Sequence, residues 1–87
     1  MIKKIAILGS TGSIGKTLLN IIANDKKNFQ IVLLTADKNH KLLLKQVKEF
    51  KVKNLIITNK KSYKFLKDKL KKNKSINVFN NYNIFNK

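Results

Sequence analysis

The sequence predicts an α/β fold in which the strands run parallel in one sheet. Three short apolar runs typical of strands alternate with three segments in which apolar residues recur at helical spacing. The runs are continuous rather than alternating, which is typical of parallel strands covered on both faces. A glycine-rich segment, Gly-Ser-Thr-Gly-Ser-Ile-Gly at residues 9–15, separates the first run from the first helical segment. Together these features predict the N-terminal mononucleotide-binding half of a doubly wound, Rossmann-like sheet.

The first strand is predicted at residues 4–8, ending at the glycine segment. Ser13 is a suitable N-cap for the helix that follows, and Asn24 with Asp25 predicts its end. Apolar residues at positions i, i+4, i+7 and i+8 give this helix its predicted core face. They are Ile14, Leu18, Ile21 and Ile22.

Two further strand–helix units and a last strand follow. The strands are predicted at residues 30–35, 55–57 and 76–79, and Asn39 is the expected N-cap of the second helix. The expected core-facing residues of the second and third helices are Leu43, Val47, Phe50, Tyr63, Leu66 and Leu70. We expect the strand order 3-2-1, with the fourth strand beside the first.

The length of 87 residues allows at most one small domain. We predict a nucleotide-binding segment at residues 1–80 and a tail at residues 81–87. The tail is rich in asparagine, with Tyr82, Ile84 and Phe85 interspersed. It is either an unstructured end or a segment whose apolar residues pack against a partner.

The charge is strongly one-sided, with 20 lysines, no arginine and a formal net charge of +16. One interpretation is a module that binds polyanions such as nucleic acid. The other is an AT-rich coding sequence, which also accounts for twelve asparagines and the lack of proline. Because nucleic-acid binders rely on arginine for bidentate contacts, we favour the second interpretation and do not expect a nucleic-acid partner.

Other bulk features narrow the class of protein. The chain has no cysteine, which excludes disulfides and thiolate metal sites. Its apolar runs are far shorter than a membrane span, and Met1 leads straight into the first strand without a signal-peptide pattern. We therefore expect a cytoplasmic protein that does not interact with membranes.

The glycine segment has the pattern G-x-x-G-x-x-G, a variant of the dinucleotide-binding fingerprint. Glycine lets the backbone turn sharply and approach a ligand closely, and the helix start offers free N–H groups to an anion. Serine and threonine hydroxyls in the loop suit a pyrophosphate, and Lys38, just past the second strand, suits a ribose 2′-phosphate. From the residues alone, Lys38 could equally be one more solvated lysine. We expect His40 at the surface and Gln46 in solvent or at the helix edge.

The residues that follow the glycine loop point to one family. The chain resembles 1-deoxy-D-xylulose 5-phosphate reductoisomerases from about Lys3 to Ile57, and the likeness fades in the lysine-rich third helix. The resemblance rests on the opening residues 3–15, on residues 28–32, and on Lys38, Asn39, Leu42, Leu43, Gln46, Glu49 and Phe50 at their present spacing.

The resemblance implies an oxidoreductase of non-mevalonate isoprenoid (isoprene) biosynthesis. Members of this family use NADPH and a divalent metal, Mg²⁺ or Mn²⁺, to rearrange and reduce 1-deoxy-D-xylulose 5-phosphate to 2-C-methyl-D-erythritol 4-phosphate. It further implies that the full-length enzyme is a homodimer. Residues 11–14 would line the cofactor phosphates, and Lys38 with Asn39 would lie at the adenosine 2′-phosphate. The candidate cofactor-binding residues are Gly9, Thr11, Gly12, Ser13, Ile14, Gly15, Asp37, Lys38 and Asn39.

Asp37 departs from the family pattern, which usually has a small residue, commonly glycine, at this position. An acid after the second strand normally bonds the ribose 2′-hydroxyl and selects NAD over NADP. Asp37 therefore either points away from the adenosine or weakens NADPH binding by charge repulsion.

The family's metal-binding carboxylates, substrate lid and catalytic domain lie further along than this chain extends. A metal site needs several convergent oxygen ligands, and the four acids are spread over separate elements. We expect no catalytic residue and no metal ligand here. The chain is interpreted as an N-terminal fragment, a truncated gene or a remnant, inactive by itself.

Two other interpretations remain. An extended short-chain dehydrogenase or epimerase also opens with a strand and a T-G-x-x-G loop, and Asp37 would suit it. Tyr63 and Lys67 have its Tyr-x-x-x-Lys spacing, although they come far too early in the chain. The other is a non-catalytic polyanion-binding module.

Overall fold

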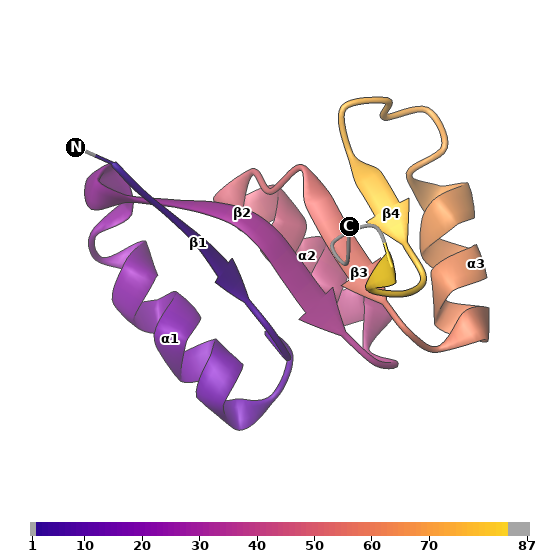
Figure 1. The fold of residues 1–87 in the computed structure, drawn as a ribbon, viewed down its shortest axis with the longest axis horizontal. Helices are drawn as coiled ribbons and strands as arrows, with labels where there is room; N and C mark the ends of the chain where they lie inside the picture. The colour runs from indigo at the N-terminus through magenta and orange to yellow at the C-terminus, as the bar shows by residue number, and fades with distance from the viewer. Residues whose placement is uncertain (1, 84–87) are drawn as a thin grey trace.

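The computed structural model describes residues 2–83, in which four parallel strands form one sheet in the order β1-β2-β3-β4 (Figure 1). The strands are β1 (Lys3–Ile7), β2 (Phe29–Ala36), β3 (Asn54–Ile57) and β4 (Asn77–Phe79). The α-helices between them are α1 (Ser13–Ala23), α2 (His40–Phe50) and α3 (Lys60–Lys69), and a 3₁₀ turn covers Lys26–Asn28. The predicted parallel α/β fold is confirmed.

The predicted position of the fourth strand is wrong, because β4 pairs with β3 rather than with β1. The N–H of Asn77 donates to the carbonyl oxygen of Lys53 at 2.7 Å, and Val78 lies opposite Leu55 in the register. The connection from α3 to β4 is short, and Leu70 at its start packs into the same core as Val78. The chain therefore continues across the sheet in one direction, away from β1.

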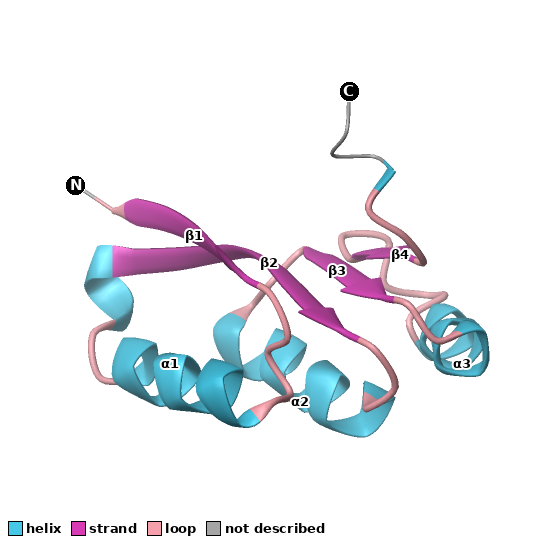
Figure 2. Cartoon of the chain, turned by 60° about the horizontal axis from the view of Figure 1, so that its bottom comes forward, coloured by secondary structure: helices cyan, strands magenta, loops and turns pink. Residues whose placement is uncertain are grey.

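The core lies between the sheet and the helices, as Figure 2 shows with α1 and α2 below the strands. The buried side chains that form this cluster come from every strand and every α-helix: Ile7, Leu19, Ile22, Ile31, Leu34, Ala36, Leu43, Val47, Val52, Leu55, Ile57, Leu66, Leu70 and Val78. The register between β1 and β2 shifts after Ile5, so that Val32 is an extra residue on β2. This irregularity lets both Ile31 and Leu34 face the helices.

The predicted core face of α1 is largely wrong. Ile14, Leu18 and Ile21 are 78%, 44% and 60% exposed, whereas the buried residues of α1 are Gly15, Leu19 and Ile22. Ser13 is also not the N-cap, because the helix begins one residue earlier with Gly12 as its cap. The predicted end is confirmed, with Asn24 as the C-cap. The close approach of Gly15 to the loop turns α1 so that Gly15, Leu19 and Ile22, at positions i, i+4 and i+7, all pack inward.

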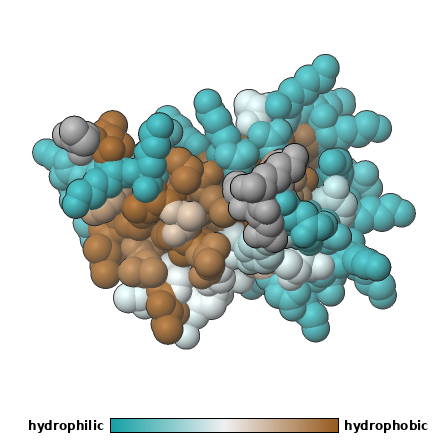
Figure 3. Space-filling model, viewed as in Figure 1, coloured by the Kyte–Doolittle hydropathy of each residue, from teal (hydrophilic) through white to brown (hydrophobic). Residues whose placement is uncertain are grey.

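The exposed residues Ile14, Leu18 and Ile21 form a row on α1, which we call the apolar stripe. Leu8, just after β1, is also 65% exposed. Figure 3 shows hydrophobic residues gathered over β1, β2 and α1, while the half of this face around α3 is hydrophilic. In the described part of the chain, β1 is an edge strand of the sheet. Apolar surface of this kind beside a sheet edge is typical of a surface that packs against further protein.

The other two helices follow their predicted patterns. Leu43, Val47, Leu66 and Leu70 are buried, and Phe50 and Tyr63 pack against the core while half-buried. In the tail, Tyr82 is exposed, whereas Ile84 and Phe85 lie outside the described residues. Over the described residues, none of the helices has the length and hydropathy needed to cross a membrane.

Candidate functional site

The loop after β1 is anchored to the end of β2. Gly9 has a φ of 69°, a left-handed conformation that favours glycine. Its N–H donates to the Thr35 hydroxyl oxygen at 2.9 Å, and the N–H of Ser10 donates to the Thr35 carbonyl oxygen at 2.9 Å. These bonds fix the loop at the carboxyl ends of the two strands, where ligands of parallel α/β sheets bind.

Gly12 and Gly15 are glycines for different reasons. A Cβ on Gly15 would clash with the carbonyl oxygen of Gly9 and would lie 2.6 Å from the Ser10 Cα, so the helix could not approach the loop. A Cβ on Gly12 would meet only the Gly9 oxygen, at 3.4 Å, which is ordinary contact. The fold itself therefore requires glycine at position 15 but not at position 12. Space at Gly12 is consistent with close approach of a ligand to the backbone.

The start of α1 is open to an anion. Gly12 caps the helix without a side-chain hydrogen bond, and the first turn contains no acidic residue. The first-turn N–H groups of an α-helix have no partner within the helix. Gly12, Ser13 and Ile14 are exposed, and Thr11 is half-buried beside them. The arrangement fits a phosphate, which would accept hydrogen bonds from these N–H groups at the positive end of the helix dipole.

Ser10 and Gln46 form a buried polar pair that the sequence did not reveal. The Ser10 hydroxyl donates to Gln46 Oε1 at 2.7 Å, and Gln46 Nε2 donates to the Ser10 carbonyl oxygen at 2.9 Å. Gln46 is 6% exposed, so the expectation that it lies in solvent or at the helix edge is wrong. The pair ties the loop to α2, and its only sequence signal was a polar residue beside Val47 on an otherwise apolar face.

Replacing Gln46 by leucine is expected to lower the free energy of unfolding by about 1–3 kcal/mol. The substitution places an apolar side chain of similar size in the core, but it leaves the Ser10 hydroxyl without this acceptor and the Ser10 carbonyl oxygen without this donor. Urea unfolding followed by circular dichroism measures the change. Lys45→Leu, at an exposed neighbouring position, is the matched control and should change stability by less than about 0.5 kcal/mol. Equal effects of the two substitutions would contradict a structural role for the pair.

Asp37 faces the end of β3. The Thr58 hydroxyl donates to Asp37 Oδ1 at 2.6 Å, and the N–H of Asn59 donates to the Asp37 carbonyl oxygen at 2.9 Å. The side chains of Asp37 and Thr58 are both exposed. Asp37 is therefore held against the turn that follows β3, and Thr58 is a further residue that the sequence did not reveal.

Lys38 and Asn39 complete the turn after β2. Lys38 is exposed, and its carbonyl oxygen accepts a hydrogen bond from the Ser62 hydroxyl at 2.8 Å. Asn39 Oδ1 accepts from the N–H of Leu42 at 3.2 Å, which confirms it as the N-cap of α2. His40 is not a free surface residue, since its ring is half-buried and lies 4.4 Å from that of Phe65 between centroids. The turn thus presents the Lys38 cation beside a fixed helix start.

Titratable residues do not form a catalytic cluster in this region. Residues 2–83 contain no group of three histidine, cysteine or acidic side chains that could hold a metal ion. Tyr63 and Lys67 lie together on α3, with the lysine Nζ 5.6 Å from the centre of the tyrosine ring. This is a cation–π contact on the surface of a helix.

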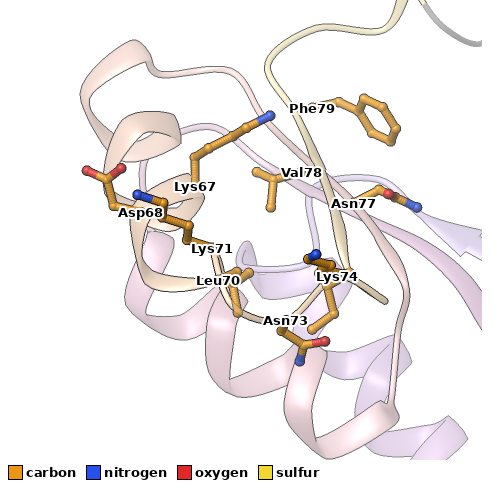
Figure 4. A pocket seen from close by; sticks show the side chains of 10 residues that line it. Lys67, Asp68, Leu70, Lys71, Asn73, Lys74, Asn77, Val78 and Phe79 are labelled. Carbon is orange, nitrogen blue, oxygen red and sulfur yellow. The ribbon is translucent and has the colours of Figure 1, made fainter.

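A cavity of about 420 Å³ lies between α3 and β4, at the opposite edge of the sheet from β1. Lys67, Lys71 and Lys74 line it together with the apolar side chains of Leu70 and Val78 (Figure 4). The glycine loop and the turn after β2 are not part of its lining. Its three lysines make this cavity the candidate site for the polyanion-binding alternative.

A parallel α/β sheet with a glycine loop between β1 and α1 defines a protein of the Rossmann-like fold class. The family model of 1-deoxy-D-xylulose 5-phosphate reductoisomerase matches residues 5–85. The chain belongs to this family of NADPH-dependent oxidoreductases, and the short-chain dehydrogenase interpretation is set aside.

Proteins with similar sequences are named 1-deoxy-D-xylulose 5-phosphate reductoisomerase. The reductoisomerase of Pelagibacter ubique is 58% identical over 85 residues, covering 98% of this chain and 22% of the relative. That of a Thermoanaerobacter species is 47% identical over 74 residues, covering 85% of this chain and 19% of the relative. The chain therefore spans about a fifth of the length of these relatives.

Solved structures that resemble this fold are also reductoisomerases. The Zymomonas mobilis reductoisomerase in complex with NADPH has a TM-score of 0.82 at 30% identity, covering 91% of this chain and 21% of that one. A reductoisomerase in complex with NADPH, fosmidomycin and magnesium has a TM-score of 0.82 at 28% identity, covering 90% and 19%. The fold described above is thus that of an NADPH-binding relative.

Proposed function

We propose that this chain supplies the NADPH-binding N-terminal segment of a 1-deoxy-D-xylulose 5-phosphate reductoisomerase. The observation that carries the proposal is the glycine loop, in which Gly12 has room for a Cβ and caps α1 without a side-chain bond. The likeness to the NADPH complex of the Zymomonas mobilis enzyme supports it. The proposed segment comprises residues 1–80, followed by the tail at 81–87.

The proposed contacts with the cofactor lie after two strands, in the glycine loop after β1 and in the turn after β2. Backbone N–H groups of Ser13 and Ile14 hold the pyrophosphate, assisted by the hydroxyls of Thr11 and Ser13. Lys38 neutralises the adenosine 2′-phosphate, and Asn39 fixes the helix start beside it. Gly9 and Gly15 shape the loop without requiring contact with the cofactor. When bound, NADPH supplies the hydride for the reduction.

Rearrangement and reduction of 1-deoxy-D-xylulose 5-phosphate to 2-C-methyl-D-erythritol 4-phosphate would require the remaining four-fifths of a reductoisomerase. The divalent metal and the substrate would be held there, because the described residues hold no cluster of metal ligands. We propose that this remaining part packs against the apolar stripe and Leu8, extending the sheet beside β1. By itself the chain would bind NADPH without catalysing the reaction.

Replacing Lys38 by alanine is expected to weaken NADPH binding about five- to tenfold and to leave NADH binding nearly unchanged. The reason is that only NADPH carries the 2′-phosphate, whose contact with a partly screened cation is worth about 1 kcal/mol. Isothermal titration calorimetry at fixed salt measures both dissociation constants.

Lys48→Ala is the matched control, since it removes the same charge from an exposed position near the other end of α2. It should reduce the affinities for NADPH and NADH only slightly and to a similar extent. If Lys48→Ala weakened NADPH binding as much as Lys38→Ala, binding would follow net charge and the specific site would be wrong.

A further inference from the structure

Four hydrogen bonds, which we call the turn clamp, join the end of β2 and the turn after it to the turn after β3 and the first turn of α3. Two join backbone groups, from Thr58 N–H to the Ala36 oxygen at 3.1 Å and from Asn59 N–H to the Asp37 oxygen at 2.9 Å. The other two come from hydroxyls, of Thr58 to Asp37 Oδ1 and of Ser62 to the Lys38 oxygen. Ser62 is itself buried, and Asn59 caps α3 because its side-chain Oδ1 accepts a hydrogen bond from the N–H of Ser62 at 3.0 Å. The two backbone bonds hold the turns together, and the bond from the Thr58 hydroxyl orients the Asp37 carboxylate.

The clamp determines the side of β2 to which Asp37 points. β2 lies between β1 and β3 in the sheet, and the glycine loop follows β1. A bond to Thr58, directly after β3, turns the carboxylate toward β3 and away from the loop. An acid at the end of β2 ordinarily bonds the ribose hydroxyls of a nucleotide held by that loop. Here the acid is present, but its side chain is engaged elsewhere.

We propose that Thr58 is a specificity-determining positioning residue. By holding Asp37 on the β3 side, it prevents this carboxylate from binding the ribose 2′-hydroxyl of NADH or repelling the 2′-phosphate of NADPH. Lys38 then determines the cofactor preference without opposition from its neighbour. The inference rests on the proposed NADPH function and explains how an acid is tolerated at this position.

The test compares dissociation constants of NADPH and NADH, measured by calorimetry on the full chain, for four proteins. Thr58→Val removes the hydroxyl at nearly constant shape and is expected to lower the preference for NADPH about fivefold, the scale of one screened charge contact. Thr58→Ser keeps the hydroxyl and should retain the wild-type preference. The double variant Thr58→Val with Asp37→Asn removes the released charge and should restore the preference.

An unchanged preference in Thr58→Val, or a lost preference that Asp37→Asn does not restore, would overturn the proposal while leaving NADPH binding by the wild-type chain intact. Failure of the wild-type chain to prefer NADPH would instead contradict the proposed function, and with it the role of Thr58. A readout without cofactor tests the clamp itself. Thr58→Val and Asp37→Ala should each lower the Tm by about 4–8 °C and together by no more than either alone. Additive Tm losses would show that the two side chains are not coupled and would also overturn the proposal.

Discussion

Gly15→Ala is expected to destabilise the chain by about 3 kcal/mol, a large part of the stability of a small domain. The added methyl group would meet the carbonyl oxygen of Gly9 and the Cα of Ser10, which are backbone atoms that cannot move aside without displacing the loop. The loop is in turn held by Thr35 and Gln46. Thermal and urea unfolding followed by circular dichroism would measure the loss.

Gly12→Ala is the control for this change, because its methyl group has ordinary contact with one oxygen atom. Its Tm should lie within a few degrees of the wild-type value, on the scale of a small surface change. A Gly15→Ala variant that melts like Gly12→Ala would contradict the close packing of α1 on the loop.

In contrast to Gly15→Ala, Gly12→Ala is expected to lower the affinity for NADPH at least tenfold while changing the stability little. A methyl group at the helix start occupies the space through which a pyrophosphate approaches the backbone N–H groups. A tenfold loss corresponds to about 1.4 kcal/mol of binding free energy. Calorimetric titration with NADPH measures it, and valine at the same position should cause a larger loss. Wild-type affinity in both variants would show that the cofactor does not bind across Gly12.

Much of the fold followed from local pattern. The strand around Leu34, the α2 face of Leu43 and Val47, and the cap at Asn39 were all predictable, because each depends on residues close together in sequence. In α1 the sequence contains two rows with the same i, i+4, i+7 spacing. One is the apolar stripe, and the other begins at Gly15 and continues through Leu19 and Ile22. Glycine gives no hydrophobic signal, so the pattern favoured the wrong row.

The rest depended on contacts between distant residues. Ser10 and Gln46 are 36 positions apart, and Asp37 and Thr58 are 21 apart, so neither pair has a local signature. The position of β4 beside β3 likewise depends on how α3 packs, which the strand pattern does not contain. The candidate cofactor residues could be named from the glycine pattern and the family resemblance. Which glycine shapes the fold and which leaves room for a ligand could be decided only from the geometry.

The most direct test of the proposed site is a titration of the ¹⁵N-labelled chain with NADPH, followed residue by residue in ¹H–¹⁵N spectra. We expect the largest amide shifts in residues 11–14 and 37–39, and tripolyphosphate at equal charge should not reproduce those at 37–39. The competing outcome is that both ligands shift mainly residues 67–74, around the lysine-lined cavity between α3 and β4. That result would mean that the chain binds polyanions through its basic surface, and it would contradict an NADPH site at the glycine loop.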